Sequence, residues 1–188
     1  MVITTTAMLA KQSIAVATGQ GARRWLCRSV PVAVDGKVAR SLKDVARGGA
    51  VQALLLPKSQ DLMCRNLMCE HVGSSCTCRL ALVLDRVPAL QRMDLSNNNL
   101  RALPDNTFEL TALTHLDVSG NVLTTLSPAI AQLQTLQDLD LRHNRLEALP
   151  EQALLALPHL QRLRIDGNPL SVDAIESPAL RRIIDSAE

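Results

Sequence analysis

The sequence predicts an α/β solenoid, in which short parallel strands stack into a sheet on the concave face and helical or irregular segments return along the other side. Three observations support this prediction. Leucines recur every 23 or 24 residues from Leu90 onward, asparagines recur in the same register, and aromatic residues are nearly absent, with one Phe, one Trp and no Tyr. Such a chain is expected to build its core from many equivalent aliphatic units.

The repeat can be followed through four consecutive units. The complete units span residues 90–112, 113–135 and 136–159, and an incomplete fourth begins at Leu160. Each unit matches LxxLxLxxNxL, with Met93, Val118 and Ile165 as apolar replacements for leucine. This pattern resembles the leucine-rich repeat family, in its short intracellular form, over residues 90–172. The resemblance implies a solenoid that binds a protein partner through exposed residues of its sheet.

Apolar residues two positions apart mark the strand of each unit, because alternate strand residues point to the same face of a sheet. The pairs expected to face the interior are Met93 and Leu95, Leu116 and Val118, Leu139 and Leu141, and Leu163 and Ile165. The return segments are expected to add Leu103, Phe108, Leu110, Leu126, Ile130, Leu133, Leu149, Leu154 and Leu157. The core should therefore run without a break from one unit to the next.

One asparagine follows the strand of every unit, at Asn98, Asn121, Asn144 and Asn168. Its amide can donate to and accept from backbone groups in the turn, which would otherwise be buried without partners. A structural ladder is therefore the predicted role of these four residues, rather than ligand binding. Replacing one by leucine should cost about 1–3 kcal/mol.

The C-terminal residues 173–188 are predicted to cap the solenoid with a helix over 178–186. Ser177 is suited to the N-cap, and Pro178 is suited to the first helical position. Leu180, Ile183 and Ile184 then form an apolar stripe on one helix face.

Residues 59–89 are interpreted as a degenerate repeat that caps the N-terminal end. Shifting the repeat by 23 residues places Leu67, Val72, Leu80, Leu84 and Val87 near core positions. The same shift places Ser75 where an asparagine would stand, so the match to the repeat is incomplete.

Residues 35–58 are predicted to form a helical linker that docks onto the solenoid. Val38, Leu42 and Val45 recur at helical spacing, and Gly48 and Gly49 should end that helix. The apolar run from Val51 to Leu56 fits either a short strand or a helix.

The N-terminal segment, residues 1–34, carries four basic residues and no acidic residue. It is also rich in Thr, Ser and Ala, a composition typical of a mitochondrial transit peptide. An unstructured basic tail on a cytoplasmic protein is the alternative. Both interpretations place the protein inside the cell.

The strand residues between the core positions should face outward on the sheet, and they are the predicted partner-binding site. They form three rows: Arg92, His115, Asp138 and Arg162; Asp94, Asp117, Asp140 and Arg164; and Ser96, Ser119, Arg142 and Asp166. Stacked carboxylates about 5 Å apart repel one another unless a cation lies nearby. Arg92, Arg142 and Arg162 could supply that charge internally, and a basic segment of a partner could supply it from outside.

Cys64, Cys69, His71, Cys76 and Cys78 lie close together in the sequence. Thiolates and imidazole together could bind zinc. The usual CxxC spacing is absent, so reduced thiols are the first interpretation, disulfides the second and zinc the third. No cofactor and no bound metal are expected.

The composition argues against several classes of function. A net charge of +2 and the lack of aromatic platforms give no support for nucleic-acid binding, and no apolar run is long enough to span a membrane. None of the common nucleotide-binding, hydrolase or metalloprotease motifs occurs, so catalysis is not expected. The predicted function is a scaffold or adaptor, within a mitochondrial assembly if residues 1–34 are a transit peptide. The first alternative is a regulatory subunit that docks on an enzyme such as a phosphatase or a ubiquitin ligase. The second is a structural module stabilised by zinc at the cysteine cluster.

Overall fold

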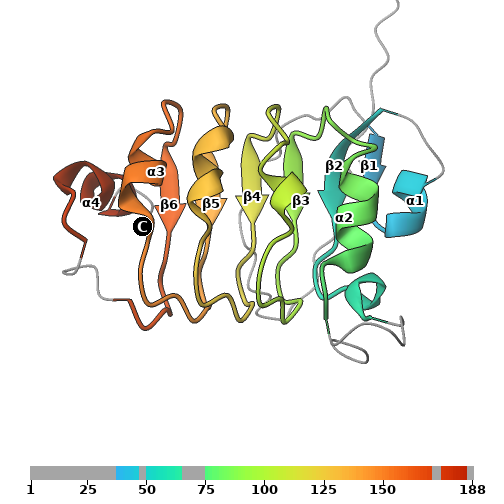
Figure 1. The fold of residues 1–188 in the computed structure, drawn as a ribbon, viewed down its shortest axis with the longest axis horizontal. Coiled ribbons are helices and arrows are strands. Elements are labelled where there is room, and N and C mark those ends of the chain that lie inside the picture. Colours follow the sequence, from blue (N-terminus) through green and yellow to red (C-terminus); the bar gives the residue numbers. More distant parts are fainter. Residues whose placement is uncertain (1–36, 47–49, 65–74, 171–174, 186–188) are drawn as a thin grey trace, which may run out of the picture. The chain divides into compact units, whose positions relative to one another are not determined.

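A computed structural model describes residues 37–46, 50–64, 75–170 and 175–185 of the chain. Within these ranges six strands form one sheet, and each strand pairs in parallel with its neighbour in the sequence (Figure 1). The strands are β1 (Lys37–Ala39), β2 (Val51–Leu55), β3 (Arg92–Asp94), β4 (His115–Asp117), β5 (Asp138–Asp140) and β6 (Arg162–Arg164). The predicted α/β solenoid with a parallel sheet is confirmed.

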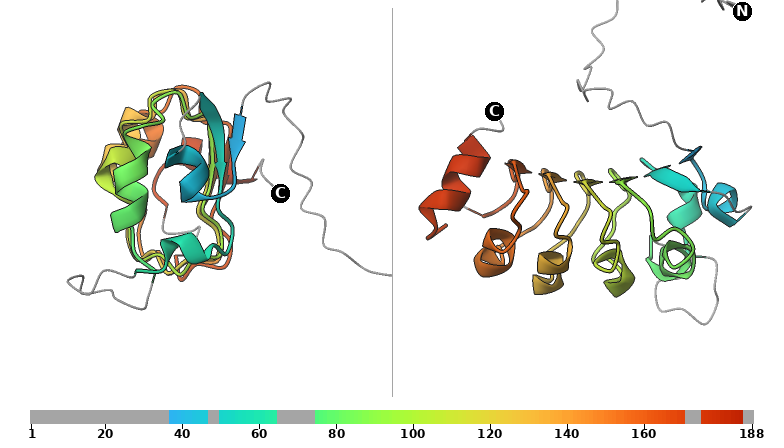
Figure 2. Two further views of the ribbon diagram at one scale, coloured as in Figure 1. Left: turned by 90° about the vertical axis from the view of Figure 1, so that its right-hand side faces the viewer. Right: turned by 90° about the horizontal axis from the view of Figure 1, so that it is seen from above.

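Short helical segments return the chain between strands. They are α1 (Leu42–Ala46), η1 (Gln60–Leu62), α2 (Cys78–Leu84), η2 (Asp105–Thr107), η3 (Pro128–Gln132), α3 (Glu151–Leu155) and α4 (Pro178–Asp185). A proline stands at the start of η2, η3 and α3, where its fixed φ suits a helix beginning. In Figure 2 the helical segments of successive coils fan out more widely than the strands, which places the sheet on the concave side.

The core lies between the sheet and the return segments and runs through every coil. All eight inward strand residues predicted from the repeat are buried, as are Phe108 and the other return-segment positions except two. Those two, Leu103 and Leu149, are partly buried and pack against the same core. An aliphatic core of this kind is the main stabilising contribution to the solenoid.

The predicted asparagine ladder is confirmed. The amide nitrogen of Asn121 donates to the carbonyl oxygens of Val118, in its own coil, and of Leu95, in the preceding coil, at 2.9 and 3.0 Å. Its Oδ1 accepts from the backbone N–H groups of Asn98 and Leu100 at 3.1 and 2.9 Å. Asn98, Asn144 and Asn168 repeat this arrangement at the other coil boundaries. Each amide therefore satisfies backbone groups that the turn leaves buried.

The segment predicted as a helical linker, residues 35–58, contains two strands, so this prediction is wrong in part. Val38 belongs to β1 and is 40% exposed, whereas the helix begins only at Leu42. Ser41 precedes the helix and its Oγ accepts from the Asp44 N–H at 3.2 Å, while the Asp61 carboxylate accepts from the Leu42 N–H at 2.9 Å. Residues 51–55 form a strand since the backbone of β3 offers a partner on that side. Gly48 and Gly49 lie outside the described residues.

The first coil also begins earlier than the 23-residue shift predicts. Leu54 pairs with Met93, and Ser59, rather than Ser75, occupies the asparagine position. The Ser59 N–H donates to Asn98 Oδ1 at 2.7 Å, across 39 residues. The coil is longer because it contains the cysteine-bearing segment between η1 and α2. Leu80, Leu84 and Val87 are buried as predicted, and Leu67 and Val72 lie outside the described residues.

The predicted C-terminal capping helix is present as α4. Leu180 and Ile184 are buried, Ile183 is partly buried, and Ser177 Oγ accepts from the Leu180 N–H at 3.5 Å. The helix covers the apolar end of the last repeat, which would otherwise be exposed to water.

Candidate functional site

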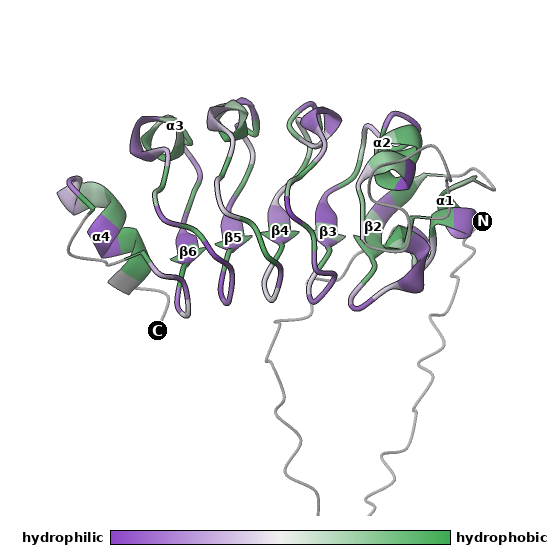
Figure 3. Cartoon of the chain, turned by 60° about the horizontal axis from the view of Figure 1, so that its bottom comes forward, coloured by the Kyte–Doolittle hydropathy of each residue, from purple (hydrophilic) through white to green (hydrophobic). Residues whose placement is uncertain are grey.

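The candidate site is the sheet face. It consists of the outward residues of β3 to β6 and of the third predicted row, Ser96, Ser119, Arg142 and Asp166. Register pairs Arg92 with His115, His115 with Asp138, and Asp138 with Arg162. The same register aligns Asp94, Asp117, Asp140 and Arg164. In Figure 3 the ribbon of β3 to β6 is mostly purple, since polar residues flank a single apolar one in each strand. The strands therefore align both rows as the sequence predicted, but Asp140 and Ser96 of the predicted binding site are buried.

At β5 and β6 the carboxylates of this face are neutralised within the protein. Asp138 pairs with Arg164 at 3.2 Å and with Arg162 at 3.4 Å. Asp140 pairs with Arg142 at 2.7 Å and with Arg164 at 3.5 Å. Three arginines thus surround two carboxylates.

The Asp140–Arg142 pair is the best formed of these contacts. Arg142 donates from Nε to Asp140 Oδ1 at 3.0 Å and from a terminal nitrogen to Oδ2 at 2.7 Å, a two-pronged geometry that fits a carboxylate. Asp140 is only 4% exposed. Internal pairing by Arg142 and Arg162 is confirmed, and the third cation is Arg164 rather than Arg92.

At β3 and β4 the carboxylates have no such partner. In the part of the chain that the structure describes, no ion pair involves Asp94 or Asp117. Asp94 accepts from the Ser96 N–H at 2.9 Å, and Asp117 accepts from the Ser119 N–H and Oγ at 2.9 and 2.7 Å. The sheet face is therefore asymmetric: among the described residues, the carboxylates of β5 form ion pairs, whereas those of β3 and β4 do not.

The pKa of the Asp117 carboxyl is raised above its ordinary value, mainly because burial disfavours the charged form. The hydrogen bonds from Ser119 act in the opposite direction, and the charges of Asp140 and Asp94 raise the pKa further. A cation placed beside Asp117 would consequently stabilise the charged form of its carboxyl.

His115 stands next to these carboxylates without bonding to one. Its Nδ1 lies 2.8 Å from Thr114 Oγ1. Burial lowers the pKa of His115, the charge of Arg92 lowers it further, and Asp138 opposes the shift. The imidazole is therefore neutral near pH 7. Its bond to a threonine rather than to a carboxylate does not form the base–carboxylate pair of a hydrolase.

The residues just after the strands form a stack of alternating large and small side chains, Asn97, Gly120, His143 and Gly167. Gly120 and Gly167 have left-handed backbones, with φ of 65° and 69°. A side chain at Gly120 would collide with Asn97, and one at Gly167 would collide with His143. Glycine is thus favoured at both positions by the neighbouring side chain and by the left-handed backbone, a conformation that Asn97 and His143 also adopt.

Three of the clustered cysteines come together in space. The sulfur atoms of Cys64, Cys76 and Cys78 all lie within 4.8 Å of one another. No disulfide joins any two of these three residues. Cys69 and His71, the other members of the predicted cluster, lie outside the described residues.

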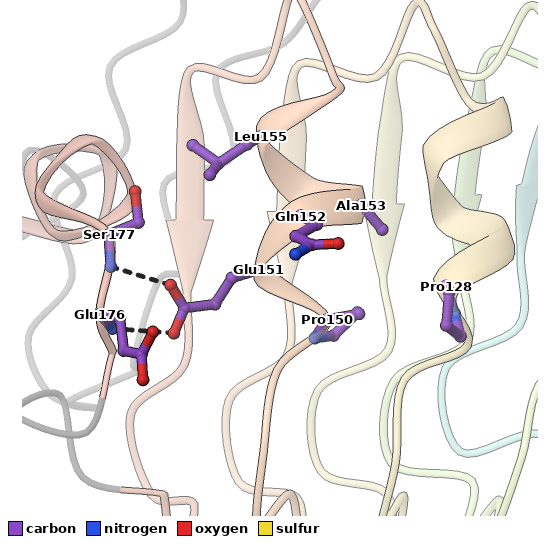
Figure 4. A pocket seen from close by; sticks show the side chains of 8 residues that line it. All are labelled: Pro128, Pro150, Glu151, Gln152, Ala153, Leu155, Glu176 and Ser177. Atoms are coloured by element: carbon purple, nitrogen blue, oxygen red, sulfur yellow. Dashed lines mark hydrogen bonds between the residues drawn. The ribbon is translucent and has the colours of Figure 1, made fainter.

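A shallow surface depression lies between η3, α3 and the segment leading into α4 (Figure 4). The Glu151 carboxylate at its edge accepts from the backbone N–H groups of Glu176 and Ser177, both at 2.9 Å. The Glu151 carboxylate therefore attaches the C-terminal cap to the last complete repeat.

Comparison with known families agrees with this architecture. A profile described as leucine-rich repeat matches residues 88–132 and 129–170. Residues 88–170 belong to the leucine-rich repeat family. Leucine-rich repeats of this kind typically serve as non-catalytic modules for protein–protein interaction. In the described residues no helix has the length and apolar character needed to cross a membrane.

Two individual proteins show the extent of the likeness. The platelet glycoprotein Ib alpha chain of Mus musculus is 54% identical over 41 residues, which are 22% of this chain and 6% of that protein. A solved leucine-rich repeat protein of Leptospira interrogans is 27% identical, with a TM-score of 0.57, over 81% of this chain and 34% of the other. This leucine-rich repeat chain therefore spans about a third or less of each relative.

Proposed function

We propose that this leucine-rich repeat protein is a non-catalytic adaptor or scaffold that binds a partner protein through its sheet face. The observation that carries the proposal is the pair of carboxylates at Asp94 and Asp117, which lie on adjacent strands without an ion pair from the rest of the described chain. Lysine or arginine side chains of a partner would pair with these two carboxylates. At the other end of the sheet, Arg142, Arg162 and Arg164 already pair with the carboxylates of β5.

The chemistry of the partner follows from this asymmetry. Parallel strands stack about 4.8 Å apart, so Asp94 and Asp117 can be engaged by one basic side chain or by two on neighbouring residues. Charges of opposite sign also speed association and reject acidic partners. A short basic segment of a larger protein is therefore the proposed ligand of β3 and β4.

The experiment is affinity purification of the full-length chain with identification of co-purifying proteins. The test variant is Asp94→Asn with Asp117→Asn, and the control is Glu109→Gln with Glu147→Gln, which removes two exposed charges outside the strands. The test variant should lose the partner while the control retains it, and recovery should fall as salt rises. Equal recovery by both variants would rule out the β3–β4 surface.

The biological setting forms a separate part of the proposal. A subunit of a large assembly should migrate with that assembly on a native gel, whereas a regulatory subunit of an enzyme such as a phosphatase or a ubiquitin ligase should be found largely at its own small size. The same purification distinguishes these two roles, because it names the co-purifying proteins.

The compartment is proposed from composition alone, since residues 1–34 lie outside the described part of the chain. Their four basic residues and lack of acids support mitochondrial targeting. A fluorescent protein fused after residue 40 should then accumulate in mitochondria. A diffuse cytosolic signal would contradict this part of the proposal and leave the binding proposal intact.

A further inference from the structure

Three thiols from separate positions converge beside the N-terminal cap. Met63 and Ser75 form an antiparallel bridge, and the Cys76 N–H donates to the Leu62 carbonyl oxygen at 3.0 Å. This bridge places Cys64 beside Cys76, and the chain then turns into α2 at Cys78. Their three sulfur atoms lie within 4.8 Å of one another.

Two of the three thiols are buried and the third faces solvent, so an ion can reach the cluster from outside. Cys64 and Cys76 are 4% and 7% exposed, whereas Cys78 is exposed. A bound dication favours the thiolate form of its cysteine ligands.

The spacing of the sulfurs is close to that of a tetrahedral metal site. A zinc–sulfur bond is about 2.3 Å long, which places two sulfurs about 3.8 Å apart around a tetrahedral ion. The three sulfurs lie at most 4.8 Å apart, within about 1 Å of that separation. A disulfide would instead use two sulfurs and leave the third as an unused thiol in the same cluster.

We propose that Cys64, Cys76 and Cys78 together bind one zinc ion. Each thiol releases its proton to solvent as it coordinates, no electron is transferred, and a water molecule can take the fourth position beside exposed Cys78. The ion would tie the bridge at residues 63 and 75 to the start of α2.

The site would reinforce a junction that already joins several elements. Asp61 caps α1 through the Leu42 N–H, and its own carbonyl oxygen accepts from Arg79 of α2 at 2.9 Å. Zinc bound next to this junction would hold the long first coil closed, which protects the apolar end of the solenoid. The proposed role is therefore structural and independent of the sheet face.

The test begins with the reduced, full-length chain after removal of metal. Cobalt(II) is the probe, because thiolate coordination in a tetrahedral site produces sulfur-to-metal charge-transfer bands and intense visible bands. We expect one equivalent of cobalt to bind and zinc to displace it. Cys76→Ser should abolish the charge-transfer bands, whereas the matched control Cys27→Ser should retain them. Retention of the bands by Cys76→Ser, or no binding by the natural chain, would overturn the proposal.

A second measurement uses only the natural sequence, so that it does not depend on how a variant folds. Zinc should slow alkylation of Cys64, Cys76 and Cys78 relative to Cys27, with peptide mass spectrometry reporting each cysteine. Zinc should also raise the Tm, and a chelator should reverse the rise. Equal alkylation of the three thiols with and without zinc would contradict the site.

Discussion

Asn98 donates a hydrogen bond from its amide nitrogen to the carbonyl oxygen of Leu56, 2.7 Å away and 42 residues earlier in the chain. The corresponding bond of the next coil, from Asn121 to Leu95, spans 26 residues. Equivalent asparagine hydrogen bonds thus close a coil of regular length and a much longer coil. Asn98 is consequently the link between the regular repeats and the N-terminal cap.

Replacing Asn98 by leucine should lower the free energy of unfolding by about 1–3 kcal/mol. The leucine fills a similar volume, but it removes the partner that Asn98 provides to the Leu56 carbonyl and to the Ser59 N–H. Urea denaturation followed by circular dichroism measures the change. Thr124→Leu, at an exposed position, is the control. Equal stability of the two variants would contradict the role of the ladder.

Glu151→Ala should loosen the C-terminal cap by about 1–2 kcal/mol, because two hydrogen bonds to a charged group are lost. Hydrogen exchange should accelerate over residues 175–185 and remain unchanged over β3 and β4. Glu147→Ala removes an exposed carboxylate from the same coil and should leave exchange unaffected. Faster exchange throughout the chain would show that Glu151 does not act on the cap specifically.

His115 should titrate below its ordinary pKa of 6.5, because burial and then Arg92 disfavour its charged form. A folded-state pKa below the unfolded value means that the unfolded chain binds the proton more tightly. The contribution of His115 to stability is therefore complete above about pH 6.5 and is lost as pH falls through the folded-state pKa.

Arg92→Gln removes the second of these causes and should raise the pKa of His115. The chemical shift of the imidazole Cε1–H group, followed by NMR against pH, measures it directly. Arg101→Gln, which changes an exposed arginine outside the strands, should have no effect. An unchanged His115 titration in Arg92→Gln would exclude Arg92 as a cause of the lowered pKa.

Asp117→Asn should raise the Tm at pH 7. The folded-state pKa of Asp117 lies above its ordinary value, so ionisation costs stability as pH rises through that range, and the amide avoids this cost. Ser119 can still donate to the amide oxygen. The gain should shrink as pH approaches about 4, where the natural carboxyl is protonated.

Thermal unfolding at several pH values tests this expectation, with Glu109→Gln as the control for loss of an exposed negative charge. A lower Tm for Asp117→Asn at pH 7 would contradict it. The same substitution is part of the partner-binding test. Loss of the partner together with a higher Tm would mean that Asp117 is retained for binding rather than for stability.

The repeated part of the protein could be predicted from the sequence alone. A local period predicts the four pairs of inward strand residues from Met93 to Ile165, the asparagine ladder and the two charged rows. It does so because each coil buries the same positions against its neighbours. The capping helix was also predictable, since proline and an apolar stripe mark it within a few residues.

Other features depend on contacts between distant, non-periodic segments, and the sequence alone did not predict them. A period of 23 residues could not locate β1 and β2, because their pairing with the sheet spans an insertion of irregular length. It could not show that Arg164 reaches two carboxylates while Asp94 and Asp117 form no ion pair with any described residue, since this depends on how far each side chain extends. The repeat also could not show that the sulfurs of Cys64, Cys76 and Cys78 lie close together. They do so because a bridge between residues 63 and 75 joins positions that no repeat relates.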